Sequence, residues 1–242
     1  MRWFSSLFLI VALIPGLAHA EVVPNPSQIS SVAIIRVPEP TEIVVMGKGS
    51  LALAFGLIGG LAVGLDAMNQ KGLFGAISRT KFSFADQLTQ DLSTALAERG
   101  LKTQLVDADR KGRPDKLLED YSAFQATGAD AILDVSTVAL GYATEHFLFS
   151  PHWRPEAHVR VALVSRASSQ RLYEERIMYG LHNPFMSAAK LDAPKQYQFA
   201  DQEAMDAADD TALIGGLKDA SKAIAAHVAK NMPTTDSKIE KP

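Results

Sequence analysis

Two hydrophobic patterns alternate along the chain, one typical of strands and one typical of helices. Residues 31–37 are rich in apolar and β-branched side chains and are closed by Pro38, a pattern typical of a strand buried on both faces. Residues 41–46 are β-branched again and predict a second short strand or extended segment. Further strands are predicted over residues 101–106 and 129–140, and a hairpin is predicted from residues 158–163 and 172–179.

Three segments show helical spacing. The hydroxyl of Ser83 can accept a backbone N–H of the following turn, so a helix is predicted over residues 84–99, with Gly100 as its left-handed stop. A second helix is predicted over residues 114–128, between a proline and a glycine. A C-terminal helix is predicted to begin near Asp209, because apolar residues then recur on one face.

This order of elements predicts an α/β fold. The expected architecture is a mixed sheet of about five strands with flanking helices, a glycine-rich apolar helical insert and a C-terminal helix. We expect a single domain over residues 21–232, with the insert at residues 49–72. Residues 233–242 are polar and are expected to form a disordered tail.

The first twenty residues predict a cleaved signal peptide. Arg2 gives a positive start, residues 3–14 are apolar or small, and Ala18 and Ala20 suit a signal peptidase, so cleavage is expected before Glu21. The apolar stretch is shorter than the roughly 20 residues that cross a bilayer. The chain contains no cysteine, so neither lipidation after the signal nor a disulfide framework is expected. The predicted location is periplasmic or exported, and membrane association is an open alternative.

Charge composition argues against one class of partner. The formal net charge is −3 at pH 7, and the basic residues form no stripe. The electrostatic footprint of a nucleic-acid binder is therefore missing, and no nucleic-acid partner is expected.

A strip of glycines is the most conspicuous motif. Gly56, Gly60 and Gly64 are spaced by four and lie in the uncharged run of residues 49–65, so on a helix they would leave a flat strip for close approach of another helix. Three interpretations stay open. The strip packs within the protein, it mediates self-association or contact with a partner, or residues 49–68 contact or enter the membrane.

A second candidate surface is the predicted connection between two strands at residues 142–155. It is longer than most hairpin loops and carries Phe147, Phe149 and Trp153. Large aromatic side chains on a loop often form a binding surface. The alternative interpretation is that these rings cover one end of the core.

Candidate chemistry is sparse. His146, His152 and His158, with Glu145, could supply zinc ligands for a metal-dependent hydrolase, although six-residue intervals match no known helical ligand spacing. The chain has no G-x-S-x-G nucleophile motif and no phosphate-binding loop. No cofactor, resident metal or catalytic activity is therefore expected.

A family resemblance rests on three segments, Val32–Val37, the insert Gly56–Gly64 and the helix-to-strand sequence from Phe84 to Val106. Over about residues 30–180 the chain resembles the periplasmic α/β domain of the curli secretion channel family and the amino-terminal domain of the TolB translocation protein. It is more similar to uncharacterised bacterial envelope proteins, many of them lipoproteins, that carry a glycine-rich insert between their first strand and first helix. Unlike the lipoproteins, this chain lacks a cysteine after the signal. The resemblance implies an envelope-assembly or accessory role without a catalytic site.

The sequence as a whole therefore predicts an exported cell-envelope protein that acts by protein–protein contacts. The predicted partner is another envelope protein or a second copy of this chain. The alternatives are a membrane-inserting oligomer packed through the glycine strip and the histidine-based hydrolase.

Overall fold

The computed structural model describes residues 29–40, 43–46, 72–146, 150–180 and 187–233. Within these ranges the strands are β1 Ser31–Ile35, β2 Ile43–Met46, β3 Lys102–Val106, β4 Ala131–His146, β5 Ser150–Ser165, β6 Arg171–Tyr179 and β7 Ala189–Leu191. The helices are α2 Gly72–Thr80, α3 Phe84–Glu98, α4 Gln202–Asp206 and α5 Asp210–Asn231, and two short 3-10 helices are η3 Ser122–Thr127 and η4 Lys195–Tyr197. The predicted signal peptide, the glycine strip and residues 234–242 of the predicted tail lie outside the described residues.

The strands form one mixed sheet, which confirms the predicted α/β class. In the described residues it has seven strands in the order β3-β1-β4-β5-β6-β7, with β2 paired to β4. The pairings β1–β3, β1–β4, β2–β4 and β6–β7 are parallel, while β4–β5 and β5–β6 are antiparallel. About five strands were expected; of the additional ones, β2 is the short second segment and β7, with three residues, carries no sequence signal of its own.

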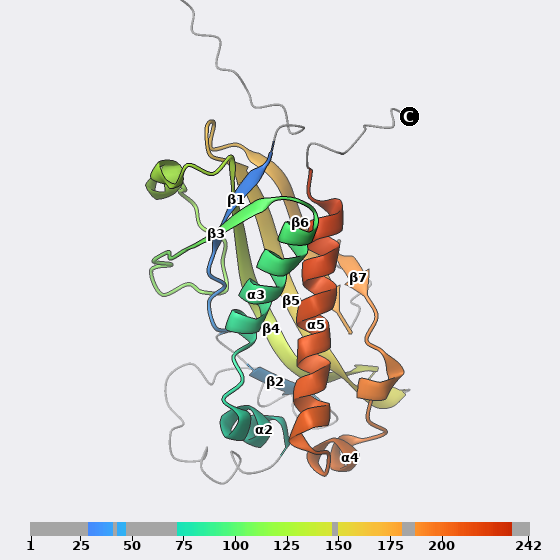
Figure 1. Ribbon diagram of the computed structural model, residues 1–242. Helices are drawn as coiled ribbons and strands as arrows, with labels where there is room; N and C mark the ends of the chain where they lie inside the picture. The colour runs from blue at the N-terminus through green and yellow to red at the C-terminus, as the bar shows by residue number, and fades with distance from the viewer. Residues whose placement is uncertain (1–28, 41–42, 47–71, 147–149, 181–186, 234–242) are drawn as a thin grey trace, which may run out of the picture.

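Helices α3 and α5 lie side by side over one face of this sheet (Figure 1). Their buried residues, such as Leu92 and Leu217, pack against the apolar side chains of β1, β4 and β5 in one large core. A smaller cluster lies on the opposite face, where Tyr121 and Phe124 cover Ile35 and Ile132. Strands β1 and β4 are thus buried on both faces, which is why residues 32–35 form a continuous apolar run.

The helix predicted over residues 84–99 is confirmed as α3. The side chain of Ser83 accepts the backbone N–H of Asp86 at 2.9 Å, as the sequence pattern predicted. After the last turn, Gly100 has a φ of +82°, in the left-handed region that favours glycine.

The helix predicted over residues 114–128 is wrong. The structure has only η3 there, followed by Gly128 in the left-handed conformation. Two hydrogen bonds to side chains compete with the helix: the backbone N–H of Leu118 donates to the carboxylate of Asp134 on β4, and that of Ser122 donates to the side chain of Asp120. The segment is therefore held open as a loop across the sheet.

The long loop predicted over residues 142–155 is also wrong. Strand β4 continues to His146 and β5 begins at Ser150, and the pairing includes Tyr142 with Pro155 and Thr144 with Trp153. The two strands are 16 residues each, about three times the usual length. Trp153, which seemed to belong to a loop, is therefore a strand residue.

Helix α5 confirms the predicted C-terminal helix and approaches the sheet closely at Gly216. A Cβ atom at this position would lie 2.3 Å from the hydroxyl oxygen of Tyr142 and 3.1 Å from Pro155. That hydroxyl donates a hydrogen bond of 3.0 Å to the backbone carbonyl of Leu213. Among the residues that the structure describes, no helix combines the length and apolar character needed to cross a membrane.

Candidate functional site

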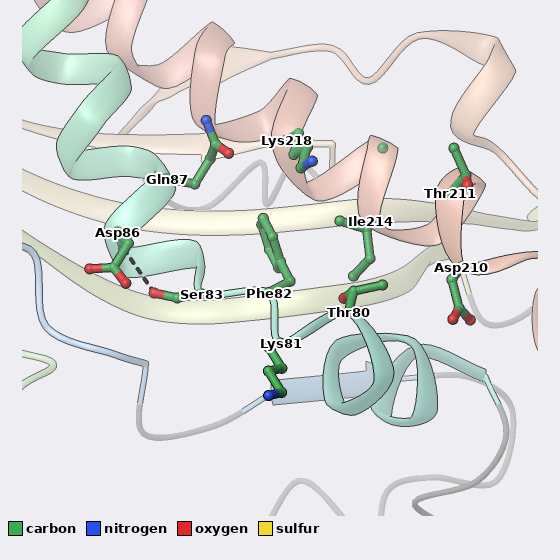
Figure 2. Close-up of a pocket in the computed structure, with 11 residues that line it drawn as sticks. Thr80, Lys81, Phe82, Ser83, Asp86, Gln87, Asp210, Thr211, Ile214 and Lys218 are labelled. Carbon is green, nitrogen blue, oxygen red and sulfur yellow. Dashed lines mark hydrogen bonds between the residues drawn. The ribbon is translucent and has the colours of Figure 1, made fainter.

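An open groove of about 510 Å³ lies between the connection from α2 to α3 and the first turns of α5 (Figure 2). Its lining includes apolar and charged side chains from two segments that are far apart in sequence. They are Thr80, Lys81, Phe82, Ser83, Asp86, Gln87, Asp210, Thr211, Ile214, Gly215 and Lys218.

The backbone at Lys81 shapes one wall of the groove. Helix α2 ends at Thr80, and Lys81 then adopts a φ of +52°, the left-handed conformation in which glycine is favoured. The N–H of Phe82 donates to the carbonyl of Ile77 at 3.2 Å, which closes the end of α2. Because Ser83 caps α3 immediately afterwards, the two helices are joined by a tight three-residue connection.

Two lysines give the groove its available positive charge. Lys81 and Lys218 are exposed, and neither forms an ion pair with a described residue. Asp210, by contrast, is held by Arg79, whose Nε and Nη2 atoms donate to its two carboxylate oxygens at 2.9 and 2.6 Å. The hydrogen bond from Arg79 lowers the pKa of Asp210.

The floor of the groove is apolar. Phe82 is half-buried and packs against the main core, and Ile214 is buried in that core. Figure 2 shows Phe82 at the centre of the groove, with Lys218 and Lys81 on opposite sides of its ring. The arrangement can hold an apolar group on its floor and negatively charged groups at its sides.

The predicted aromatic surface is described only at Trp153. Phe147 and Phe149 lie outside the described residues, as do Gly56, Gly60 and Gly64. Trp153 is 4% exposed and belongs to the main core, and its backbone exchanges two hydrogen bonds with Phe199, of 2.8 and 2.9 Å. Its ring therefore packs inside the protein, as the alternative interpretation of this segment has it.

The histidines predicted as metal ligands cannot bind one ion together. His152 and His158 lie on the same strand β5, six residues apart, so strand geometry separates them by about 20 Å. The backbone of His146 pairs with that of Ser150, still farther from His158. His158 instead places its Nε2 atom 2.8 Å from a carboxylate oxygen of Glu156. The described residues contain no group of three or more acidic, histidine or cysteine side chains that could hold a metal ion.

A buried carboxylate that the sequence analysis did not single out is Asp134, in the middle of β4. It is fully buried and accepts bonds from Arg110 at 2.6 Å, from the N–H of Leu118 at 2.7 Å and from the hydroxyl of Tyr121 at 2.9 Å. Burial and the neighbouring carboxylate raise the pKa of Tyr121. The acid within the otherwise apolar stretch of residues 131–135 was the available signal. Its bonds go to the segment that crosses the second face of the sheet, so its role is structural.

The groove was not predicted because its parts come together only in three dimensions. The cap at Ser83 was predicted, but nothing near Lys81 in sequence indicates that α5 would pass beside it. The unusual backbone of Lys81 has no sequence signature either, since most left-handed helix ends carry glycine.

Comparisons with known proteins do not assign a family. No family model matches the chain, and no curated protein matches it. One solved structure, described as a neuraminyllactose-binding hemagglutinin homolog from Helicobacter pylori, aligns with 85% of this chain and 87% of its own length. The sequence identity is 12% and the TM-score is 0.36, too low for the similarity to support a conclusion about fold or function.

Proposed function

We propose that this chain is an exported cell-envelope accessory or assembly protein that acts by protein contacts rather than by catalysis. We further propose that the groove beside Lys81 binds a segment of its partner. The predicted signal peptide supports the export, and the shape of the groove supports the mode of action, because an open apolar floor with charged sides suits an extended polypeptide.

The observation that carries the proposal is the left-handed backbone of Lys81. A side chain with a Cβ atom in this conformation costs about 1 kcal/mol relative to glycine, which would fit without strain. Strained residues persist mainly where the side chain has a use. The side chain retained here is an exposed lysine at the edge of the groove, where it is available to a ligand.

The groove also indicates the chemistry of the partner segment. Phe82 and Ile214 offer contact area to an apolar side chain, and Lys81 and Lys218 offer charges to carboxylates on either side of it. We therefore propose that the bound segment carries an apolar residue flanked by aspartate or glutamate.

A charge-swap experiment tests this proposal. The mature protein is titrated with a fluorescent decapeptide that has a central phenylalanine flanked by aspartates, and with the same peptide carrying lysines instead. The aspartate peptide should bind, and the double substitution Lys81→Glu with Lys218→Glu should weaken it at least tenfold while improving binding of the lysine peptide. Lys222→Glu, on the same helix but outside the groove, is the matched control. Equal effects of the groove and control substitutions would refute the proposal.

The substitution Lys81→Gly separates binding from stability. It relieves the backbone strain, so the free energy of unfolding should rise by about 0.5–1 kcal/mol, while binding of the aspartate peptide weakens. If Lys81 had a purely structural role, the gain in stability would not be accompanied by a loss of peptide binding. If Lys81→Gly gains stability and binds the peptide unchanged, the lysine has no part in recognition.

Export is tested separately in cells. Fractionation should place the protein in the periplasm, with a mature amino terminus at Glu21. Photocrosslinking from Thr211, on the wall of the groove, then captures the partner segment for comparison with the peptide. If the protein is found in the cytoplasm with residues 1–20 still attached, the envelope role is contradicted. That result would leave the groove's affinity for acidic segments unaffected.

A further inference from the structure

The two ends of the strand order differ in how their edges are protected. At one end, β7 covers only Ile177–Tyr179 of β6, and the rest of β6 carries charges of both signs that include an ion pair between Arg171 and Glu174. The pairing of β5 with β6 is also irregular between Leu163 and Val164. Charge and irregular pairing are the usual devices that prevent an edge from pairing with another chain.

At the other end, β3 has few such devices. It pairs with β1 in an unbroken parallel register over Lys102–Val106, and residues 103–106 contain no charge and no proline. Leu105 is 41% exposed, one of two large apolar side chains described as exposed in this structure. The contrast with β6 indicates that the β3 edge is kept open to a strand.

The backbone of β3 shows which groups are available. The N–H of Lys102 donates to Ser30 and the carbonyl of Val106 accepts from Arg36, both at 2.9 Å, so alternate residues from Lys102 to Val106 face β1. The N–H and carbonyl groups of Thr103 and Leu105 consequently face outward, since successive residues of a strand point their backbone groups to opposite sides. No described residue hydrogen-bonds to them.

We infer that β3 pairs antiparallel with β3 of a second copy of this chain. With the two-fold axis at Gln104, Thr103 of one copy lies opposite Leu105 of the other, so all four outward pairs of N–H and carbonyl groups are used. Lys102 falls opposite Val106, and no like charges face each other. The joined sheet then ends on both sides at the protected β6 and β7 edge, which closes the assembly as a dimer.

The size of this contact predicts its strength. A five-residue strand by itself buries less than the roughly 1,200 Å² of a standard stable interface, so the dimer is expected to be weak and to depend on concentration. Helix α3 lies beside the same edge, where the hydroxyls of Ser93 and Thr103 are 2.9 Å apart, and is therefore brought toward its counterpart. This self-association is independent of the groove, which lies at the connection before α3.

Disulfide trapping tests the register. The chain contains no cysteine, so Gln104→Cys introduces a single thiol on the two-fold axis. A residue opposite itself at this position forms a non-hydrogen-bonded pair, whose Cα atoms lie about 4.5 Å apart, within the range of a disulfide. Under mild oxidation at micromolar protein, Gln104→Cys should be trapped as a dimer at least tenfold faster than Glu174→Cys, an exposed thiol on the protected edge. Equal trapping rates would overturn the inference.

A second pair of variants tests the association without a crosslink. Leu105→Pro removes one outward N–H but none of the bonds to β1, and proline is tolerated at such edge positions. Leu105→Lys adds a charge within the uncharged stretch of residues 103–106 and keeps the backbone intact. Sedimentation of the mature protein from micromolar to millimolar concentration should show a dimer whose dissociation constant rises at least tenfold in both variants. A monomer at every concentration, or a dimer that neither substitution weakens, would overturn the inference.

Discussion

Replacing Gly216 with alanine should destabilise the protein, although the same change usually stabilises a helix. Within a helix, alanine is favoured over glycine by about 1 kcal/mol. Here the added Cβ atom would lie 2.3 Å from the hydroxyl oxygen of Tyr142, and ordinary contact begins near 3.4 Å. The tyrosine ring or the helix must therefore move by roughly 1 Å.

The cost of that movement follows from what Tyr142 does. Its side chain is fully buried, and its hydroxyl donates to the carbonyl of Leu213. Leaving a buried hydroxyl unpaired costs about 1–3 kcal/mol, and overpacking a core costs about 1–3 kcal/mol. After subtracting the gain in helix propensity, we expect a net loss of about 1–5 kcal/mol, which lowers the melting temperature by roughly 2–20 °C in a chain of this size.

Chemical denaturation of a four-member set measures this effect. The set consists of the original protein, Gly216→Ala, Tyr142→Phe, which removes the clashing oxygen, and the double variant. In the background of Tyr142→Phe, the Gly216→Ala substitution should lower the free energy of unfolding by less than about 1 kcal/mol. Gly215→Ala is the matched control, because its Cβ would meet the movable ring of Tyr197 at 3.0 Å. If Gly216→Ala is as stable as the original protein, or if Tyr142→Phe does not reduce its cost, the close approach of α5 is not as described.

Three further substitutions test other parts of the fold. Asp134→Ala should lower the free energy of unfolding, measured by urea denaturation, by about 3–5 kcal/mol, because it leaves the buried guanidinium of Arg110 without its counterion. The double variant with Arg110→Ala should lose less than the sum of the two single losses, because no unpaired charge is then buried. Burial opposes ionisation of Asp130, but hydrogen bonds from Ser30 and Ser31 outweigh it and lower the pKa of Asp130 below its unfolded value. Asp130 therefore stabilises the fold above about pH 4, and this contribution is lost as the pH falls through the lower folded pKa. Between pH 7 and pH 3 the free energy of unfolding should fall more in the original protein than in Asp130→Asn. Ser83→Ala should cost about 1 kcal/mol in thermal denaturation, because the N–H of Asp86 loses its cap.

Local signals in the sequence predicted the elements whose stability is itself local. The cap at Ser83, the stop at Gly100 and the apolar spacing of α3 and α5 all act within a few residues, and each matches the structure. The prediction over residues 114–128 failed because the deciding partner, Asp134, is distant in sequence. A proline and a glycine at suitable spacing indicate helix ends, but a competing hydrogen bond from another strand is invisible to a local pattern.

The same limit applies to the candidate sites. Trp153 seemed to be a loop residue because the strands around it carry aromatic and polar residues without clear alternation, yet pairing of β4 with β5 places it in the core. The groove beside Lys81 and the open edge at β3 depend on which elements become neighbours. No motif in the chain records that outcome.

A repeated pentapeptide separates most clearly what the sequence determined from what the tertiary structure decided. Leu-Ile-Gly-Gly-Leu occurs at residues 57–61 and again at 213–217. By itself the sequence determined that both copies are apolar and contain the small residues that permit close contact, together with the α/β order of strands and helices around them. Only the tertiary structure decided that the second copy lies against Tyr142 and Pro155, because the distance between a helix and a sheet is set by the side chains that meet there, and these come from different parts of the chain.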